Sequence, residues 1–339
     1  MTIEAPSVGS GFASVRTANA LFDDAIDAAR GPALDRIATF STKFQPLDDV
    51  LGGGFRAQEL VLVGGRPGVG KTIAALQWAR SMALQGRTAL YVCYEHSPQV
   101  LLGRLFALEL GSLVRADEVT ALDKLRGLAQ EVALGAGGIA DLVADPLGEE
   151  ALGRVRAYGD RLRLMQASGK ATGMTEIDEI VRLHREGPTA LFVDYVQKVN
   201  SGRPVEDEAV RTTWVVESLK DLAMTHEIAV VGIAASDKPA FEARRMRLHH
   251  LRGSAALAHE CDVALIFNEK AVAVSKTHLA YDPVRAETFK RKVVITVEKN
   301  RGGPAAMDLE FTKDFGSYRF DPDGTFVTER LVDEVLIDE

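Results

Sequence analysis

The segment "VLVGGRPGVGKT" combines glycines, a lysine and a hydroxyl residue at a spacing that can hold a row of phosphates. The pattern G-x-x-x-x-G-K-[ST] is met by Gly65, Gly70, Lys71 and Thr72. Glycines let backbone N–H groups turn toward phosphate oxygens, and the start of a following helix adds positive potential. The lysine can reach the β- and γ-phosphates, and the threonine hydroxyl can bind Mg²⁺. We therefore predict a nucleotide site formed by Gly65, Arg66, Pro67, Gly68, Val69, Gly70, Lys71, Thr72 and Ile73.

Two apolar segments end in carboxylates that could complete this chemistry. "ALFVDY" contains Asp194 at its end, where a carboxylate can hold the water shell of Mg²⁺ beside Thr72. An aspartate there could instead cap the next turn. "ALYVCYE" ends in Glu95, which could orient or deprotonate an attacking water from a strand adjacent to the phosphate-loop strand. The alternative for Glu95 is a surface glutamate.

A late segment, "VVITVEKNRGG", places Lys299 and Arg301 two positions apart. Alternate residues of an extended chain point the same way, so both cations could reach one anion. One interpretation is that they touch a phosphate held by an adjacent subunit. The residues alone favour a solvated basic turn.

Composition limits the classes of function. The formal net charge of −8 argues against indiscriminate nucleic-acid binding over a basic surface, but a local basic patch remains open. Both cysteines, Cys93 and Cys261, lie in apolar runs and are expected to be buried, reduced thiols. The sequence contains neither a membrane span nor a signal peptide, so we expect a cytoplasmic protein without a membrane partner.

The elements that would position these residues alternate between strands and helices, which is typical of an α/β fold with a mainly parallel sheet flanked by helices. A hairpin is predicted in "MDLEFTKDFGSYRF", and a mostly helical segment between Leu110 and Arg161, broken at residues 135–138, is expected beside the sheet. The predicted strands are Leu60–Val63, Ala89–Tyr94, Arg163–Met165, Ala190–Val193, Ala229–Ala234, Val263–Phe267 and Val293–Val297.

The ends of the chain differ from this core. Residues 1–12 are small and polar and predict a disordered tail. Residues 13–36 contain an amphipathic helix, up to residue 30, and a connection. The helix needs an apolar surface, either on its own domain or on a neighbouring copy. We assign residues 37–325 to the ATPase domain and residues 326–339 to a C-terminal tail.

From about Ile37 to Phe320 the chain resembles the RecA-like motor domain of DnaB-type replicative helicases. "FSTKFQPLDDVLGGGFRAQELVLVGGRPGVGKT" looks like the family's lead-in and phosphate loop. "YVCYEHSPQVLLGRLFALELG" is similar to its strand with the catalytic glutamate, and "LFVDYVQKV" to its Asp-Tyr-hydrophobic-Gln segment. "LRGSAALAHECDVALIF" and "EKNRGGP" resemble its Leu-Arg-x-Ser element and its Lys-x-Arg finger.

The resemblance implies a RecA-like P-loop NTPase fold and a hexameric ring with ATP sites between subunits. It implies that Glu95 activates water, that Thr72 and Asp194 serve Mg²⁺, and that Lys299 and Arg301 reach the neighbour's γ-phosphate. The helix at residues 13–30 would correspond to the family's linker helix, which docks on the adjacent protomer.

The resemblance also implies single-stranded DNA in the central channel, on the loops that follow the Asp194 and Ala229–Ala234 strands. The first loop, "NSGRPVEDEAVR", mixes arginines with acidic residues and predicts a weak DNA ligand. The second, "DKPAFEARRMRLHHLRGS", is the densest basic segment and could follow backbone phosphates, or be a solvated charged loop. Its candidate DNA contacts are Lys238, Arg244, Arg245, Arg247 and Arg252.

Two departures from the family leave two functions open. We expect the N-terminal helical domain to be absent, and Ser236 stands near the position where the family usually has a polar sensor glutamine. The leading hypothesis is an ATP-dependent, ring-forming helicase or translocase on single-stranded DNA, with replication or loading proteins as possible partners. The alternative is a RecA-fold ATPase that uses ATP to control oligomeric assembly or regulation without unwinding DNA.

Overall fold

The computed structural model describes residues 17–30, 39–113, 119–136, 138–202, 208–237, 243–274 and 283–333. The predicted tail at residues 1–12, the candidate DNA contact Lys238 and residues 334–339 lie outside these ranges. Backbone contacts divide the chain into two units, Met1–Ala38 and Thr39–Glu339.

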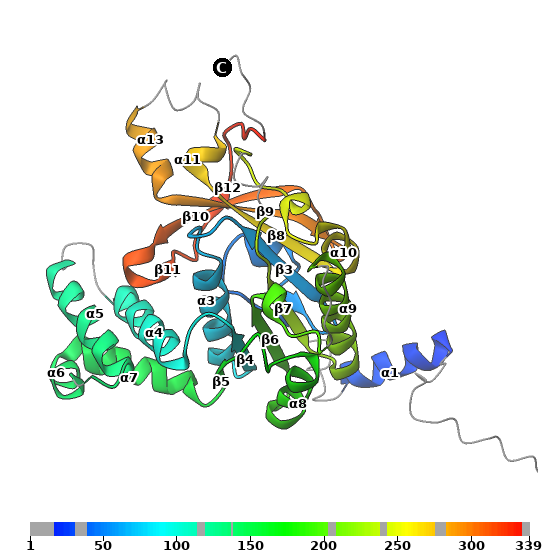
Figure 1. Cartoon of the computed structure of the whole chain (residues 1–339), viewed down its shortest axis with the longest axis horizontal. Helices are drawn as coiled ribbons and strands as arrows, with labels where there is room; N and C mark the ends of the chain where they lie inside the picture. Colours follow the sequence, from blue (N-terminus) through cyan, green and yellow to red (C-terminus); the bar gives the residue numbers. More distant parts are fainter. Residues whose placement is uncertain are drawn as a thin grey trace, which may run out of the picture. The chain divides into compact units, whose positions relative to one another are not determined.

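The described part of the first unit is Thr17 and helix α1, Ala18–Arg30 (Figure 1). Its start is fixed by Thr17, whose hydroxyl accepts a hydrogen bond from the backbone N–H of Ala20 at 3.2 Å, a typical N-cap. The predicted helix at residues 13–30 is therefore present from Ala18, and residues 13–16 lie outside the described ranges.

The second unit opens with a two-stranded sheet and continues into a sheet of ten strands, counted over the described residues. The strands are β1 (Thr39–Phe40), β2 (Phe55–Arg56), β3 (Leu60–Gly65), β4 (Thr88–Cys93), β5 (Leu162–Gln166), β6 (Thr189–Asp194), β7 (Ala229–Ile233), β8 (Val263–Glu269), β9 (Lys292–Asn300), β10 (Met307–Asp314), β11 (Arg319–Phe320) and β12 (Thr325–Phe326).

Helices connect most of these strands. They are α2 (Leu47–Val50), α3 (Lys71–Leu84), α4 (Pro98–Leu113), α5 (Val119–Ala133), α6 (Ile139–Ala144), α7 (Pro146–Gly159), α8 (Met174–His184), α9 (Glu208–His226), α10 (Ser254–Glu260), α11 (Lys270–Ala273) and α13 (Pro283–Lys290). The 3-10 turns are η2 (Val196–Lys198), η4 (Leu248–His250) and η5 (Phe315–Ser317).

The large sheet follows the order β11-β10-β9-β8-β3-β7-β6-β4-β5, with β12 also paired to β10. Strands β8, β3, β7, β6, β4 and β5 run parallel, and the β8–β9 and later pairings are antiparallel. The predicted mainly parallel sheet is confirmed, and the predicted hairpin forms the antiparallel pair β10–β11. Each predicted strand is present, with its ends shifted by a few residues.

Both faces of β3, β4, β6, β7 and β8 are buried, which explains their continuous apolar runs, whereas the edge strand β5 is partly exposed. Val61 and Val63 of β3 face a core shared with α3, α4 and α7, whereas Leu60 and Leu62 face one shared with α8, α9 and α10. Figure 1 shows the two helical groups on either side of the sheet. The predicted helical segment between Leu110 and Arg161 contains the end of α4 and helices α5 to α7, and its glycine break contains Gly135 and Gly138 at φ +74° and +80°.

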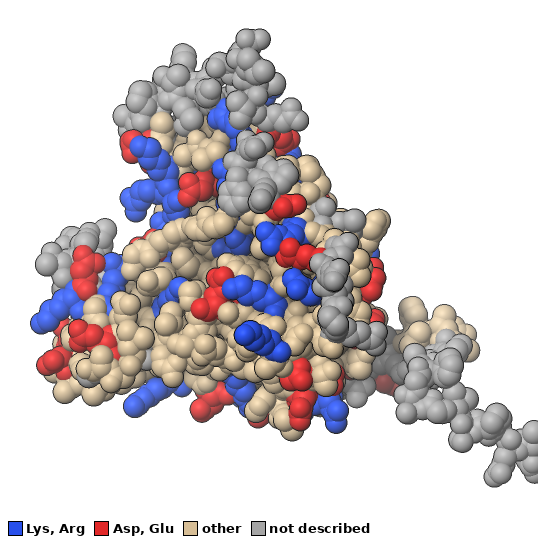
Figure 2. Space-filling model, viewed as in Figure 1, with Lys and Arg blue, Asp and Glu red and all other residues tan. Residues whose placement is uncertain are grey.

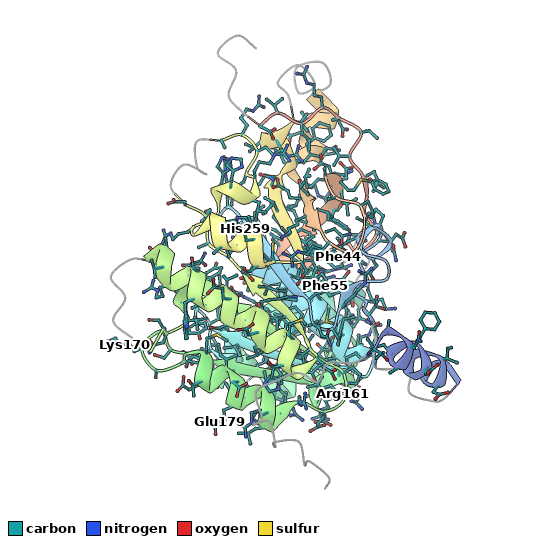
Figure 3. All side chains as sticks on the ribbon, turned by 90° about the vertical axis from the view of Figure 1, so that its right-hand side faces the viewer. Phe44, Phe55, Arg161, Lys170, Glu179 and His259 are labelled. Carbon is teal, nitrogen blue, oxygen red and sulfur yellow. The ribbon has the colours of Figure 1, made fainter. Side chains whose placement is uncertain are left out.

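An aromatic cluster holds the segment before β3 against helix α3. Phe44 is fully buried, and its ring lies 5.7 Å from Trp78, 5.1 Å from Phe311 and 6.2 Å from Phe320. Phe55 packs edge-on against the same Trp78 ring at 5.4 Å, and Figure 3 shows Phe44 and Phe55 in the interior. Because Trp78 belongs to α3, this cluster fixes the helix that begins at the phosphate loop.

Two further sequence expectations concern small features. Cys93 and Cys261 are both buried with free thiols, as predicted. Across the part of the chain that the structure describes, no helix has the length and apolar character needed to cross a bilayer.

The aromatic cluster gives a stability prediction. Phe44→Ala should lower the free energy of unfolding by about 3–5 kcal/mol, because it leaves a cavity among packed rings. The matched control, Phe326→Ala, removes a ring that is 47% exposed and should cost under about 1 kcal/mol. Chemical denaturation of the nucleotide-free protein measures both, and equal losses would contradict a core at Phe44.

Candidate functional site

The predicted phosphate loop connects β3 to α3 in a conformation that requires glycine. Gly70 stands at the N-cap of α3 with φ +101°, and a Cβ there would lie 2.6 Å from Phe315. Gly65 has φ +152°, and a Cβ there would lie 2.9 Å from both Phe267 and Val69. Both positions therefore require glycine, and the loop leads directly into the N-terminus of α3, where anions bind.

Lys71 is folded back onto this loop. Its ammonium is buried and donates to the carbonyl oxygens of Gly65 at 2.7 Å and Arg66 at 3.0 Å. Burial lowers the pKa of Lys71 to about 8, and the charges of Asp194 and Glu95 oppose this shift. A group in this state gains a stronger partner when a phosphate enters the loop.

The Asp194 carboxylate, at the end of β6, contacts Thr72 in the first turn of α3. Its Oδ2 accepts hydrogen bonds from the hydroxyls of Thr72 at 2.9 Å and Tyr91 at 3.0 Å. Its Oδ1 is buried and has no hydrogen-bond partner among the described residues. Burial raises the pKa of Asp194 to about 6, although both hydroxyls lower it. A buried carboxylate oxygen without a donor, beside a threonine hydroxyl, fits the oxygen ligands that Mg²⁺ takes.

Glu95 lines a pocket together with Lys71 and Thr72, but the strand that it follows has a different place in the sheet than predicted. Its strand was expected to be adjacent to the phosphate-loop strand, whereas β7 and β6 lie between β3 and β4. Tyr91↔Phe192 and Cys93↔Asp194 set the register, so Glu95 lies beyond Asp194 at the same edge of the sheet. The pocket of about 190 Å³ is lined by Gly68, Gly70, Lys71, Thr72, Ile73, Glu95, His96, Arg104, Tyr195 and Tyr318.

Sequence reasoning missed the aromatic and cationic side chains at this pocket. The Arg104 guanidinium lies 5.3 Å from the Tyr318 ring centre and 3.0 Å from the imidazole of His96. These three residues also line a cavity of about 550 Å³ between α4 and α5. A planar cation over an aromatic ring can hold the flat face of a base. An arginine on the helix after Glu95 was the available signal, but Tyr318 lies over 200 positions away and only the fold joins them.

Lys299 and Arg301 lie away from their own chain's phosphate loop. The register matches Lys299 to Ala264 of β8, and Ala264 to Leu62, three positions before Gly65. The Arg301 backbone is therefore about 15 Å or more from the loop along the strand direction. Both side chains converge on the carbonyl oxygen of His259, at 3.2 Å from Lys299 and 2.6 Å from Arg301. Figure 3 labels His259 near the end of α10.

Each described arginine of the basic segment already has a partner in its own chain. Arg244 donates to the carbonyl oxygens of Val272 and Val274. Arg245 is buried and donates to Thr296 and Asp308.

The other two arginines bind carboxylates. Arg247 holds Asp333 through two hydrogen bonds of 2.8 and 2.9 Å and contacts Glu298 at 3.2 Å. Arg252 donates to Glu208 at 2.9 Å. A phosphate that binds here must therefore displace an internal anion or accept a remaining N–H.

Comparisons with known proteins agree with this geometry. The family model described as "AAA domain" matches residues 28–240. The replicative DNA helicase DnaB of Treponema pallidum (strain Nichols) is 25% identical over 295 residues, which cover 83% of this chain and 59% of that protein. The chain thus spans about three fifths of the length of this relative.

Solved structures have the same fold. One solved structure, described as an "ATPase Domain", superposes with a TM-score of 0.69 at 18% identity, covering 91% of this chain and 99% of that one. "The Structure Of A DnaB-Like Replicative Helicase And Its Interactions With Primase" gives a TM-score of 0.66 at 18% identity, covering 91% of this chain and 67% of that one. The chain belongs to the AAA domain family, and its fold is the RecA-like ATPase domain of DnaB-type helicases.

The buried carboxylate gives a pH prediction. Burial raises the pKa of Asp194 from 3.8 to about 6. The folded state therefore loses stability as the pH rises from the pKa of the unfolded state through the pKa of the folded state. Asp194→Asn stays neutral and should stabilise the metal-free protein at pH 8 by on the order of 2 kcal/mol. That gain should vanish near pH 4. Thermal unfolding in the presence of a chelator at both pH values measures this gain. An equal gain at both pH values would contradict a raised pKa of Asp194 in the folded state.

Proposed function

We propose that this chain hydrolyses ATP at sites shared between copies in a ring and uses the energy to move along single-stranded DNA. One observation carries the catalytic part: Lys71, Thr72 and Glu95 line one pocket at the carboxyl edge of the parallel strands, and Asp194 accepts a hydrogen bond from Thr72 beside it. Membership of the AAA domain family supports nucleotide binding there.

The chemistry follows from the positions of these groups. Loop N–H groups and Lys71 bind the β- and γ-phosphates, and Thr72 and Asp194 hold Mg²⁺, which neutralises phosphate charge when bound. Glu95 accepts a proton from the attacking water while the water oxygen bonds to the γ-phosphorus. The bond from phosphorus to the bridging oxygen breaks, and ADP leaves with that electron pair. Arg104 and Tyr318 hold the base at the mouth of the pocket.

We assign Lys299 and Arg301 to the phosphates of a neighbouring copy. Their distance along the sheet from their own loop supports this assignment. Within their own chain both donate to the carbonyl oxygen of His259, and Arg301 also pairs with Asp262, so these contacts would be exchanged for the neighbour's phosphate. A ring closes when each copy offers its loop to one neighbour and its two cations to the other. The amphipathic helix α1 would join such neighbours, and replication or loading proteins remain proposed partners.

The DNA contacts we propose are the more exposed arginines of the basic segment. Arg247 and Arg252 have side chains 27% and 41% exposed, whereas Arg245 is 7% exposed. Charges of both signs are interspersed on the face in Figure 2, which suits a local DNA site better than a broad basic surface. Lys238 and Arg244 stay part of this proposal, and Arg245 would hold the segment through Asp308.

A second function has one observation in its favour. Three described arginines of the basic segment, Arg245, Arg247 and Arg252, pair with Asp308, Asp333 and Glu208 within the chain. This pairing suits an ATPase that changes its oligomeric assembly without holding DNA. The two functions differ in whether single-stranded DNA changes the rate of ATP hydrolysis.

Shared sites predict complementation between inactive variants. Arg301→Ala and Glu95→Gln should each reduce ATP hydrolysis at least about 100-fold. Mixed one to one and reassembled, they should recover about a quarter of wild-type kcat. In a random ring, a quarter of the interfaces combine an intact Glu95 from one copy with an intact Arg301 from the next.

The control replaces Glu95→Gln protein in the mixture by the double variant Glu95→Gln, Arg301→Ala, which offers no intact finger. Steady-state phosphate release measures all the mixtures. Recovery no larger than that of the control would contradict sites shared between copies.

The DNA proposal predicts a specific loss at Arg252. Single-stranded DNA should stimulate hydrolysis, and Arg252→Ala should weaken DNA binding about three- to tenfold and reduce the salt slope by about 1. Arg154→Ala is the matched control, because the Arg154 side chain is 40% exposed and binds Glu150 at 2.8 Å, much as Arg252 binds Glu208. If no DNA changes the hydrolysis rate, the assembly ATPase replaces the motor.

A further inference from the structure

The side chain of Lys198 reaches the candidate general base from a rigidly held turn. Lys198 ends η2, which directly follows Asp194 and Tyr195. Val196 is fully buried, and the Gln197 amide accepts from the Ala235 N–H at 3.0 Å and donates to the Arg252 carbonyl oxygen at 3.2 Å. The Lys198 backbone is therefore fixed, and its four-carbon stem supplies the freedom to move.

The Lys198 ammonium is paired with Glu95. Its Nζ lies 3.2 Å from Glu95 Oε1, with the two side chains 47% and 34% exposed. Exposed pairs of this kind contribute little to stability, so the pair opens easily. The pairing also occupies an oxygen of the carboxylate that has to accept a proton from water.

We propose that Lys198 leaves Glu95 for the terminal phosphate when ATP binds and thereby distinguishes the triphosphate from the diphosphate. The proposal rests on the proposed ATPase function of this pocket and adds a specificity residue to it. With ADP bound, the phosphate nearest Glu95 is absent and Lys198 stays on the carboxylate. With ATP bound, Lys198 adds a charge-assisted contact and frees the base in the same movement.

The distances allow this exchange. A base lies within about 3.2 Å of the water that it activates, and that water lies about 3.5 Å from phosphorus, so the terminal phosphate is within about 7 Å of Glu95. Lys198 Nζ starts 3.2 Å from the same carboxylate. The terminal phosphate is therefore within about 10 Å of this ammonium, and rotation about the four-carbon stem can move the ammonium toward it without moving η2. Lys71, which approaches from the loop side, binds whichever phosphates are present and cannot make this distinction alone.

The test compares the affinities of ADP and of a non-hydrolysable ATP analogue, both with Mg²⁺, by calorimetry on the full chain. Lys198→Met should weaken the analogue about tenfold and ADP by less than about twofold. Lys198→Arg should restore most of the preference for the analogue. Lys290→Met is the matched control, because Lys290 is an exposed lysine that pairs with Glu287 outside the pocket.

Equal losses for both nucleotides, or no loss for either, would overturn the role of Lys198. Wild-type protein that binds the analogue and ADP while Lys198→Met behaves identically would leave the proposed ATPase intact and remove only this inference. Wild-type protein that binds neither nucleotide would remove the ATPase proposal itself, and the role of Lys198 with it.

Discussion

The hydrogen bond from the Thr72 hydroxyl to Asp194 is the contact on which the site depends. It joins residues 122 positions apart because β3 and β6 end at the same edge of one parallel sheet. The Asp194 carboxylate is fully buried, and its second oxygen has no donor among the described residues. Such an arrangement is unfavourable by itself, since burial disfavours the charge. It becomes favourable once a cation fills the position beside Oδ1, so the carboxylate is better explained by ligand binding than by stability.

The sheet also separates the two halves of the proposed chemistry. The phosphate loop lies at the carboxyl end of β3, and Lys299 and Arg301 lie toward the opposite end, on the antiparallel strand β9 and just after it. A rigid sheet cannot bring these ends together. A site that uses both therefore needs two copies, and hydrolysis in such a site would be sensitive to how neighbours sit against each other. Under the proposed function, this geometry would couple hydrolysis to the relative positions of neighbouring copies.

The sequence predicted what depends on local pattern. Apolar runs indicated the strands, and the glycine spacing indicated the phosphate loop, because both are set by neighbouring residues. The order of strands was not predictable in this way, and Glu95 proved to follow a strand separated from β3 by two others. Arg245 looked like a free cation, yet Asp308, over 60 positions away, neutralises it. Tyr318 and Arg104 meet only because β10, β11 and α4 fold onto the same pocket.

The central claim is that a triphosphate bound in one copy's glycine loop is also contacted by cations of the next copy. A structure of the assembled particle with Mg²⁺ and a non-hydrolysable ATP analogue tests it most directly. We expect phosphates on residues 65–72, a metal ion between Thr72 and Asp194, and Lys299 or Arg301 of an adjacent copy within hydrogen-bond distance of the terminal phosphate. Analogue bound with both cations distant from every phosphate, or bound elsewhere on the chain, would contradict the account.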